Sequence, residues 1–270
     1  MSPRQKKSFS QVFLRDGSVA RRIIESLPLE KNKTILEIGP GDARMTLPLA
    51  DSGVRLFCVE VDPVFADGVR SKVAGYANVR VINEDALKFD YEQLHKETGG
   101  RFTVFGNLPY SISTPLIVSF VQNHPFIDDV FIMVQKEVAL KITSSPGSKQ
   151  YGFLPVFTWP FFETEVLFHI GRQAFSPVPK VDSSFIHLKP RVKPFVDHQH
   201  ISKYMRFARG IFDQRRKKMR NVVSGLAADK EKLQSVFEQA GIDPDSRPEG
   251  VGQEGFVSLF SHKSGHSPFN

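Results

Sequence analysis

Short apolar runs alternate with stretches of helical periodicity along the first half of the chain. The apolar runs predict strands at residues 34–38, 54–61, 79–82, 102–105 and 129–135. The stretches before and between them predict helices at residues 16–27, 43–51, 63–73 and 114–122. Strands that alternate with helices favour right-handed crossovers and a parallel sheet. The pattern therefore predicts an α/β fold.

The pattern changes in the second half of the chain. Two strand-like runs, residues 165–170 and 183–188, flank a proline-rich loop and predict an antiparallel hairpin at the edge of the sheet. Pro190 and Pro194 bracket a linker, and helical stretches follow it at residues 201–212, 215–226, 229–240 and 253–260. We therefore predict an α/β domain and a helical domain, at residues 1–190 and 191–270.

Charge and composition narrow the class of partner. The 270 residues carry a formal net charge of +7, which favours nucleic acid first and an acidic membrane surface a distant second. The single cysteine, Cys58, excludes an internal disulfide and a cysteine metal cluster and is typical of a reducing compartment. The eight histidines show no paired spacing, so we expect no metal. With no apolar run long enough to cross a membrane and no signal-peptide pattern, we expect a cytoplasmic protein.

The most informative motif is the turn that follows the fourth predicted strand. It consists of Asn107, Leu108, Pro109 and Tyr110, directly after Gly106. Proline fixes its own backbone and pushes the residue before it toward an extended shape. The turn thus presents an amide, carbonyl oxygens and an aromatic face to one spot, which suits a flat heterocycle with an exocyclic amine. A plain surface turn is the alternative for so short a motif.

Polar groups and glycines follow three of the predicted strands, where open α/β sheets bind ligands. Gly39 and Gly41 let the backbone approach a ligand, Glu60 suits the two hydroxyls of a ribose, and Asp85 suits an adenine amino group. Arg44 stands where a dinucleotide motif has its third glycine, so a pyrophosphate site is disfavoured. The combination favours S-adenosylmethionine, although each acid taken singly is more typical of a solvated loop.

Eight ordered motifs give the chain a family resemblance. They are KSFSQVFL at 7–14, EIGPG at 37–41, EDA at 84–86, GNLPYSISTP at 106–115, QKEVA at 135–139, FSPVPKVDS at 175–183, FDQRRKKMRN at 212–221 and RPE at 247–249. With these motifs the chain resembles the ribosomal RNA adenine dimethyltransferases, and their small-subunit branch most closely.

The resemblance implies a fold, a reaction and a partner. The fold is a Rossmann-like S-adenosylmethionine-dependent methyltransferase sheet with a small C-terminal helical domain. The reaction is transfer of two methyl groups to N6 of each of two adjacent adenosines near the 3′ end of small-subunit (16S) rRNA. The partner is this rRNA within a ribosomal subunit precursor, which implies a role in subunit biogenesis. We expect a monomer with no membrane partner.

The resemblance also assigns residues by position. Cofactor contacts fall at Val12, Leu14, Gly39, Glu60, Asp85 and Asn107. For the target base, the Asn107 amide oxygen and the Leu108 carbonyl accept the two N6 hydrogens, and Pro109 shapes the turn. Tyr110 and, by resemblance, Phe175 sandwich the base.

A basic run in the C-terminal region predicts an RNA contact. Its members are Arg215, Arg216, Lys217, Lys218 and Arg220. We interpret them as phosphate contacts, with a solvated helix face as the alternative. Lys6, Lys7 and Arg15 predict a second basic contact.

The chain departs from the family pattern at four positions, and three alternative functions stay open beside the small-subunit enzyme. Ser10 replaces the usual glycine and Val12 the usual asparagine, while Pro155 and Thr158 replace a serine and a glutamine. The alternatives are a large-subunit rRNA adenine methyltransferase that confers antibiotic resistance, a catalytically weak relative that serves as a nucleic-acid-binding assembly or transcription factor, and a DNA adenine methyltransferase.

Overall fold

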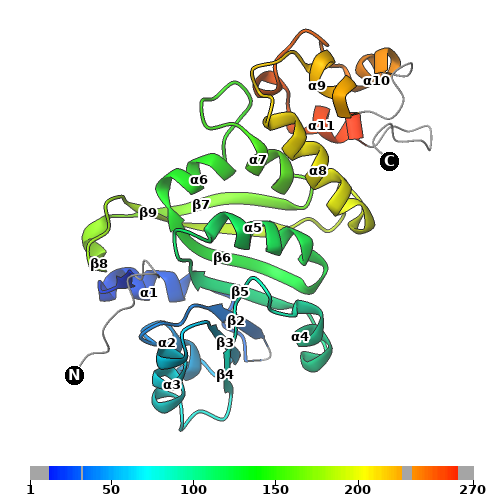
Figure 1. Cartoon of the computed structure of the whole chain (residues 1–270). Helices are drawn as coiled ribbons and strands as arrows, with labels where there is room; N and C mark the ends of the chain where they lie inside the picture. Colours follow the sequence, from blue (N-terminus) through cyan, green and yellow to red (C-terminus); the bar gives the residue numbers. More distant parts are fainter. Residues whose placement is uncertain (1–11, 32, 227–232, 261–270) are drawn as a thin grey trace. The chain divides into compact units, whose positions relative to one another are not determined.

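The chain folds into two compact units. The computed structural model describes residues 12–31, 33–226 and 233–260 (Figure 1). The α/β unit comprises Met1–Ala139 and Glu165–Lys189, and the helical unit comprises Leu140–Thr164 and Pro190–Asn270. A break between the units therefore falls at Lys189 and Pro190. The sequence placed its boundary near residue 190 and did not anticipate that residues 140–164 group with the C-terminal helices.

Within the described residues, seven strands form one mixed sheet in the order β4-β3-β2-β5-β6-β9-β7. The strands are β2 (Thr34–Ile38), β3 (Arg55–Glu60), β4 (Val79–Asn83), β5 (Phe102–Asn107), β6 (Ile127–Gln135), β7 (Phe162–Ile170) and β9 (Ser183–Pro190). The five strands from β4 to β6 in this order are parallel, and β9 runs antiparallel to β6. The α/β prediction is confirmed, and β9 and β7 complete one edge of the sheet as the sequence predicted.

Capping residues set the start of two of the helices that precede or connect the strands. The helices are α1 (Gly17–Glu25), α2 (Thr46–Asp51), α3 (Pro63–Lys72), α4 (Tyr91–Thr98), α5 (Ser113–Gln122) and α6 (Lys136–Ile142). Asp16 caps α1 by accepting from the backbone N–H of Ser18 and Val19, and Asp62 caps α3 in the same way. Helix α2 begins at Thr46 rather than at residue 43, which leaves Pro48 in its first turn, where proline is tolerated.

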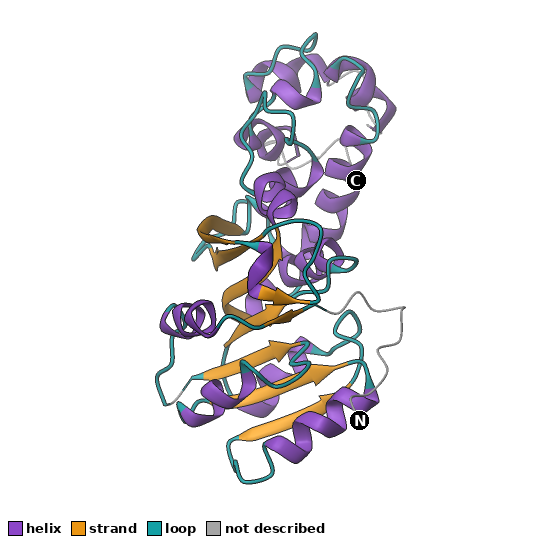
Figure 2. Ribbon diagram, turned by 90° about the vertical axis from the view of Figure 1, so that its left-hand side faces the viewer, coloured by secondary structure: helices purple, strands orange, loops and turns teal. Residues whose placement is uncertain are grey.

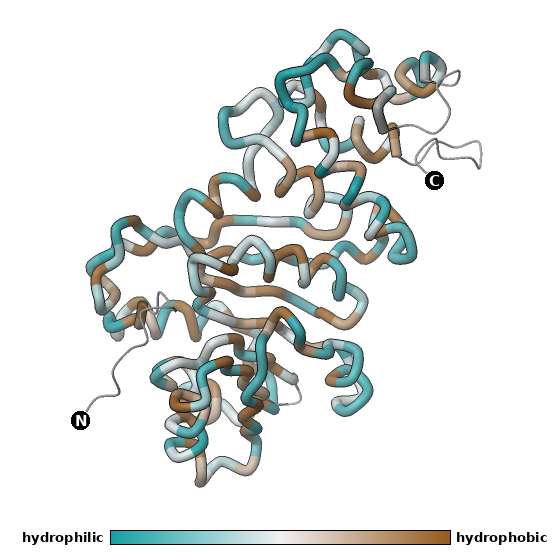
Figure 3. Tube along the Cα trace, in the orientation of Figure 1, coloured by the Kyte–Doolittle hydropathy of each residue, from teal (hydrophilic) through white to brown (hydrophobic). Residues whose placement is uncertain are grey.

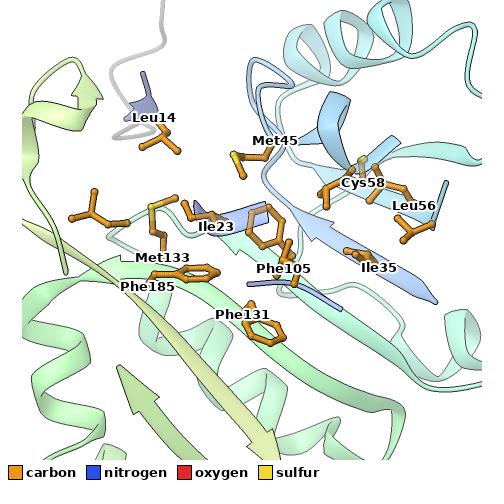
Figure 4. Packing of buried hydrophobic residues seen from close by; sticks show 14 of the residues in the cluster. Leu14, Ile23, Ile35, Met45, Leu56, Cys58, Phe105, Phe131, Met133 and Phe185 are labelled. Carbon is orange, nitrogen blue, oxygen red and sulfur yellow. The ribbon is translucent and has the colours of Figure 1, made fainter. Parts of the chain in front are cut away.

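One hydrophobic cluster of the α/β unit joins α1 to the sheet. Ile23 of α1 is fully buried against side chains from several strands (Figure 4). These strand residues include Ile35, Leu56, Cys58, Phe105, Phe131 and Phe185. Burial at nearly every position of β2 and β5 explains their mainly apolar sequences, which Figure 3 shows along the central strands. Cys58 is a buried core residue, as its sequence context indicated.

The helical unit packs around aromatic residues. Its helices are α7 (Phe153–Thr158), α8 (Ile201–Phe212), α9 (Met219–Leu226), α10 (Leu233–Ala240) and α11 (Gln253–Phe260), shown in purple in Figure 2. The buried Tyr151 and Tyr204 hydroxyls donate to the carbonyls of Val251 and Val156 at 2.8 and 3.0 Å. No described helix is long and apolar enough to span a membrane.

Each of the four predicted C-terminal helices has a counterpart among the described residues, but not every boundary is correct. Helix α9 begins at Met219, so residues 215–218 lie in the preceding turn and the predicted helix 215–226 starts too early. Met219 and Arg220 donate their backbone N–H groups to the carbonyls of Ser246 and Pro244, which fixes this start. The beginning of the predicted helix 229–240 lies outside the described residues, and its described part is α10.

Candidate functional site

The candidate site lies at the point where the strand order reverses. Strands β3 and β4 follow on one side of β2, whereas β6 follows on the far side of its other neighbour, β5. Open α/β sheets bind ligands at the carboxyl ends of strands at such a reversal. Ile38 pairs with Gly106, so the turns after β2 and β5 begin side by side. A side chain at position 106 would place its Cβ 2.7 Å from the Ile38 carbonyl oxygen, so glycine is needed for this approach.

The amide of Asn107 is oriented by the N-terminal segment. Its Nδ2 donates to the carbonyl oxygen of Val12 at 3.0 Å, which leaves Oδ1 to accept from a ligand. Val12 precedes β1 (Phe13–Leu14), which pairs antiparallel with β8 (Phe175–Ser176) and is thereby held in place. The departure from asparagine at Val12 preserves this contact because the acceptor is a backbone carbonyl.

The residues after Asn107 supply a second acceptor and an aromatic ring. The Leu108 N–H donates to the Met133 carbonyl at 3.1 Å, and no described residue donates to the Leu108 carbonyl. The Tyr110 hydroxyl lies 3.0 Å from Oγ of the buried Ser183, which fixes the ring position. The turn therefore presents two hydrogen-bond acceptors beside a half-buried ring.

Phe175 lies apart from this group. Its side chain is 2% exposed and packs in the core that Leu14 shares. Among the described residues, those that line the site pocket do not include Phe175. In this arrangement its ring is not available to a base, so its stacking role stays a prediction that requires movement of β8.

A pocket of about 110 Å³ joins the strand ends. It is lined by all six positions that the resemblance assigned to the cofactor, namely Val12, Leu14, Gly39, Glu60, Asp85 and Asn107, and also by Leu108, Pro109 and Tyr110. Gly39 and Gly41 have positive φ angles of 69° and 54°, and a Cβ at Gly41 would lie 2.8 Å from the Phe13 ring. Both glycines are therefore required to let the loop after β2 border the pocket.

Glu60, the last residue of β3, and Asp85, which follows β4, retain acceptor capacity. Glu60 is buried, and its carboxylate oxygens accept from the N–H groups of Asp62 at 3.0 Å and Gly41 at 3.2 Å. Burial raises the pKa of Glu60, partly offset by these hydrogen bonds. Asp85 accepts from the Leu87 N–H through Oδ1 at 3.0 Å. Each carboxylate has lone pairs left, which suit ribose hydroxyls and a ring amino group.

Glu37 is a pocket residue to which the sequence reasoning gave no role of its own. It lines the pocket at only 2% exposure, and the Cys58 thiol donates to its Oε2 at 3.5 Å. Burial raises its pKa to about 7. The signal was present in the sequence, since Glu37 is the one charged residue in the otherwise uncharged run 34–38.

Replacing Glu37 with glutamine is expected to stabilise the protein at high pH. Because the folded-state pKa of about 7 lies above the ordinary carboxyl pKa of 4.5, the neutral carboxyl contributes stability below pH 4.5, and this is lost as pH rises through 7. The free energy of unfolding of Glu37→Gln is therefore expected to exceed that of wild type by about 3 kcal/mol at pH 8 and by much less at pH 5. Thermal unfolding at both pH values measures it. Glu92→Gln, on the exposed face of α4, is the control; an equal change at both pH values for Glu37→Gln would refute the assignment.

Within residues 12–31, 33–226 and 233–260, no group of three or more His, Cys, Asp and Glu side chains is arranged to hold a metal ion. The basic segment at 215–220 is largely ion-paired: Arg215 contacts Glu249 at 2.9 Å, and Lys218 and Arg220 both contact Asp245. Arg15 contacts Asp42 at 3.2 Å, whereas Lys6, Lys7 and Ser10 lie outside the described residues.

Comparison with solved structures defines the class of protein. The fold matches a dimethyladenosine transferase from Plasmodium falciparum with a TM-score of 0.78 at 22% identity, covering 92% of this chain and 96% of that one. It also matches the 23S rRNA methyltransferase ErmE with a TM-score of 0.69 at 28% identity, covering 92% and 97%. The α/β unit therefore has the Rossmann-like fold of methyltransferases.

Sequence comparison then defines the family. The family model of ribosomal RNA adenine dimethylases matches residues 3–264. Proteins named ribosomal RNA small subunit methyltransferase A are 38% identical over 259 residues in Pseudomonas fluorescens and 36% identical over 256 residues in Pseudomonas aeruginosa. Each alignment covers 95% of this chain and 93% of the relative. The chain belongs to the ribosomal RNA adenine dimethylase family.

Proposed function

We propose that this protein dimethylates N6 of two adjacent adenosines near the 3′ end of small-subunit (16S) rRNA, with S-adenosylmethionine as methyl donor, and thereby acts in small-subunit biogenesis. The observation that carries the proposal is the orientation of Asn107, whose Nδ2 is held by the Val12 carbonyl while Oδ1 is left to accept. Relatives named for the small subunit match almost the whole chain at 36–38% identity, which favours that subunit over the large one.

The pocket residues fit the proposed donor. Glu60 would hold the ribose hydroxyls and Asp85 the adenine amino group, while Gly39 and Gly41 leave room at the end of β2. When bound, S-adenosylmethionine supplies an electrophilic methyl group on a sulfonium. The buried Glu37 adds a carboxyl that a nearby cation would favour in its ionised form.

The turn after β5 prepares the nucleophile. The lone pair of adenine N6 is delocalised into the ring, so the free amine is a poor nucleophile. Asn107 Oδ1 and the Leu108 carbonyl accept its two hydrogens and localise the lone pair on nitrogen, while Tyr110 stacks on the ring. Positioning of this kind supplies several kcal/mol. Methylation makes the nitrogen strongly acidic, so its proton passes to water without a side-chain base.

We propose that the basic run contacts rRNA phosphates. Its cations contribute unequally to RNA binding because some of them are held in ion pairs. Arg216 is exposed and has no acidic partner among the described residues, whereas the ion pair with Glu249 occupies Arg215. Arg216→Glu is therefore expected to weaken RNA binding and to reduce its salt slope by about one. Glu249→Gln frees Arg215 and is expected to strengthen binding. RNA titrations at several salt concentrations measure both, and equal salt slopes in all three proteins would reject the contact.

The substrate is tested by transfer of labelled methyl groups from S-adenosylmethionine. Three substrates are compared: small subunits lacking the dimethyladenosines, deproteinised large-subunit rRNA, and duplex DNA. We expect dimethyladenosine on the small subunit alone. Transfer to large-subunit rRNA or to DNA instead would replace the proposal, and retained RNA binding without any transfer would identify a binding protein.

A further inference from the structure

An exposed aromatic stack lies in the helical unit, outside the methyl-transfer site. Trp159 follows α7, and Phe195 lies in the loop between Pro190 and α8. Their rings are nearly parallel, with centroids 4.7 Å apart and planes inclined by 3°. Phe195 is nevertheless 51% exposed. A ring that stacks on Trp159 and still leaves half of its residue exposed offers surface to a ligand.

The stack is fixed before any ligand binds. The Arg191 guanidinium lies 5.1 Å from both ring centroids, donates through Nε to the Trp159 carbonyl at 2.8 Å, and forms an ion pair with Glu163 at 2.8 Å. The backbone N–H groups of Arg191 and Phe195 donate to carbonyls of Phe161 and Pro160. Because the loop is pinned at both ends, the rings lose little conformational freedom on binding.

The surroundings of the stack are polar and basic. Trp159, Glu163 and Arg191 also border a pocket of about 270 Å³, which is lined further by Ser144, Ser145, Thr164 and Gln253. The departures Pro155 and Thr158 line the same pocket. Lys193 is exposed between Arg191 and Phe195. An aromatic face beside hydroxyls, an amide and a cation matches the base, ribose and phosphate of a nucleotide.

We propose that the exposed ring of Phe195 stacks on an unpaired base of the RNA substrate, with the sugar and phosphate of that nucleotide directed to the polar pocket and Lys193. The inference rests on the proposed function in taking RNA as the substrate. Net charge favours RNA over a peptide, since the chain carries +7 and Lys193 is a second cation in the loop that holds Phe195. Every base has a π face, so this contact does not depend on the RNA sequence. It contributes to affinity rather than to the choice of base.

The only tryptophan of the chain reports on this site. Trp159 is that residue, so binding at Phe195 is expected to change intrinsic fluorescence. A short unstructured RNA oligonucleotide should give a saturable change, and duplex RNA of equal length a much smaller one. Phe195→Leu keeps an apolar side chain but removes the ring, and is expected to weaken binding about tenfold, while Phe195→Tyr restores it. Val192→Ala, at a fully exposed apolar residue of the same loop, is the matched control and should bind as wild type.

Methyl transfer to small subunits supplies the second readout. Phe195→Leu should raise KM for the subunit with kcat and cofactor affinity unchanged, since the stack is not part of the methyl-transfer pocket. An unchanged KM, equal losses in Val192→Ala, or fluorescence changes with a proline-rich peptide but not with RNA would overturn the inference. If wild type bound single-stranded RNA at Phe195 but methylated no rRNA, the proposed function would fail while this site remained.

Discussion

Asn107→Ala is expected to lower kcat for methyl transfer by about two to three orders of magnitude, with RNA affinity nearly unchanged. The variant loses Oδ1, which Nδ2 holds in place by donating to the Val12 carbonyl at 3.0 Å. Loss of one aligned polar group at a reacting atom typically costs about 10²–10³ in kcat. Single-turnover methylation of undermethylated small subunits, with RNA binding measured in parallel, separates the two effects.

A second substitution at the same position tests the two halves of the amide separately. Asn107→Asp keeps an acceptor oxygen but replaces the donor to Val12 by a carboxylate, which the Val12 carbonyl repels. We expect kcat to fall in this variant too, because the side chain rotates away from the N-terminal segment. If Asn107→Asp retained full activity, the Val12 contact would not orient the amide. If Asn107→Ala lost kcat and RNA affinity equally, Asn107 would be a binding residue only.

Much of the site follows from strand ends that the sequence alone reveals. The strands at 34–38 and 102–105 are mostly apolar without a strict alternation of apolar and polar positions, which is typical of strands buried on both faces. Once the strands are parallel, their carboxyl ends meet at one edge, so residues that follow different strands come together. Gly39, Glu60 and Asp85 line one pocket for this reason.

The rest of the site depends on contacts between segments that are far apart in the chain. Such contacts cannot be recognised in a single sequence. The pairing of β1 with β8 joins residues 13–14 to residues 175–176 and places the Val12 carbonyl at Asn107. The basic run looks like a free cationic surface until Asp245 and Glu249 are found beside it. Short helices were missed for a different reason: α4 buries only two residues, too few to give a period.

Gly106→Ala is expected to destabilise the fold and to reduce methyl transfer further than the loss of stability explains. The added Cβ would lie 2.7 Å from the Ile38 carbonyl oxygen, a backbone atom that moves only with strand β2. Overpacking of this kind costs about 1–3 kcal/mol. Separation of β5 from β2 would also shift Asn107, the next residue, away from Gly39. Denaturant unfolding and kcat are the two measurements.

Gly68→Ala is the matched control for this substitution, because it adds the same methyl group where there is room. Gly68 is exposed within α3, and a Cβ there meets no atom within 4 Å. Alanine in a helix interior is favoured over glycine by about 0.5–1 kcal/mol, so this variant should be slightly more stable than wild type, with unchanged kcat. If the two substitutions changed stability in opposite directions, the requirement for glycine at position 106 would come from the close approach of β2 and β5. If Gly106→Ala were as stable and as active as Gly68→Ala, the strand spacing would adapt, and the site geometry would not depend on glycine at this position.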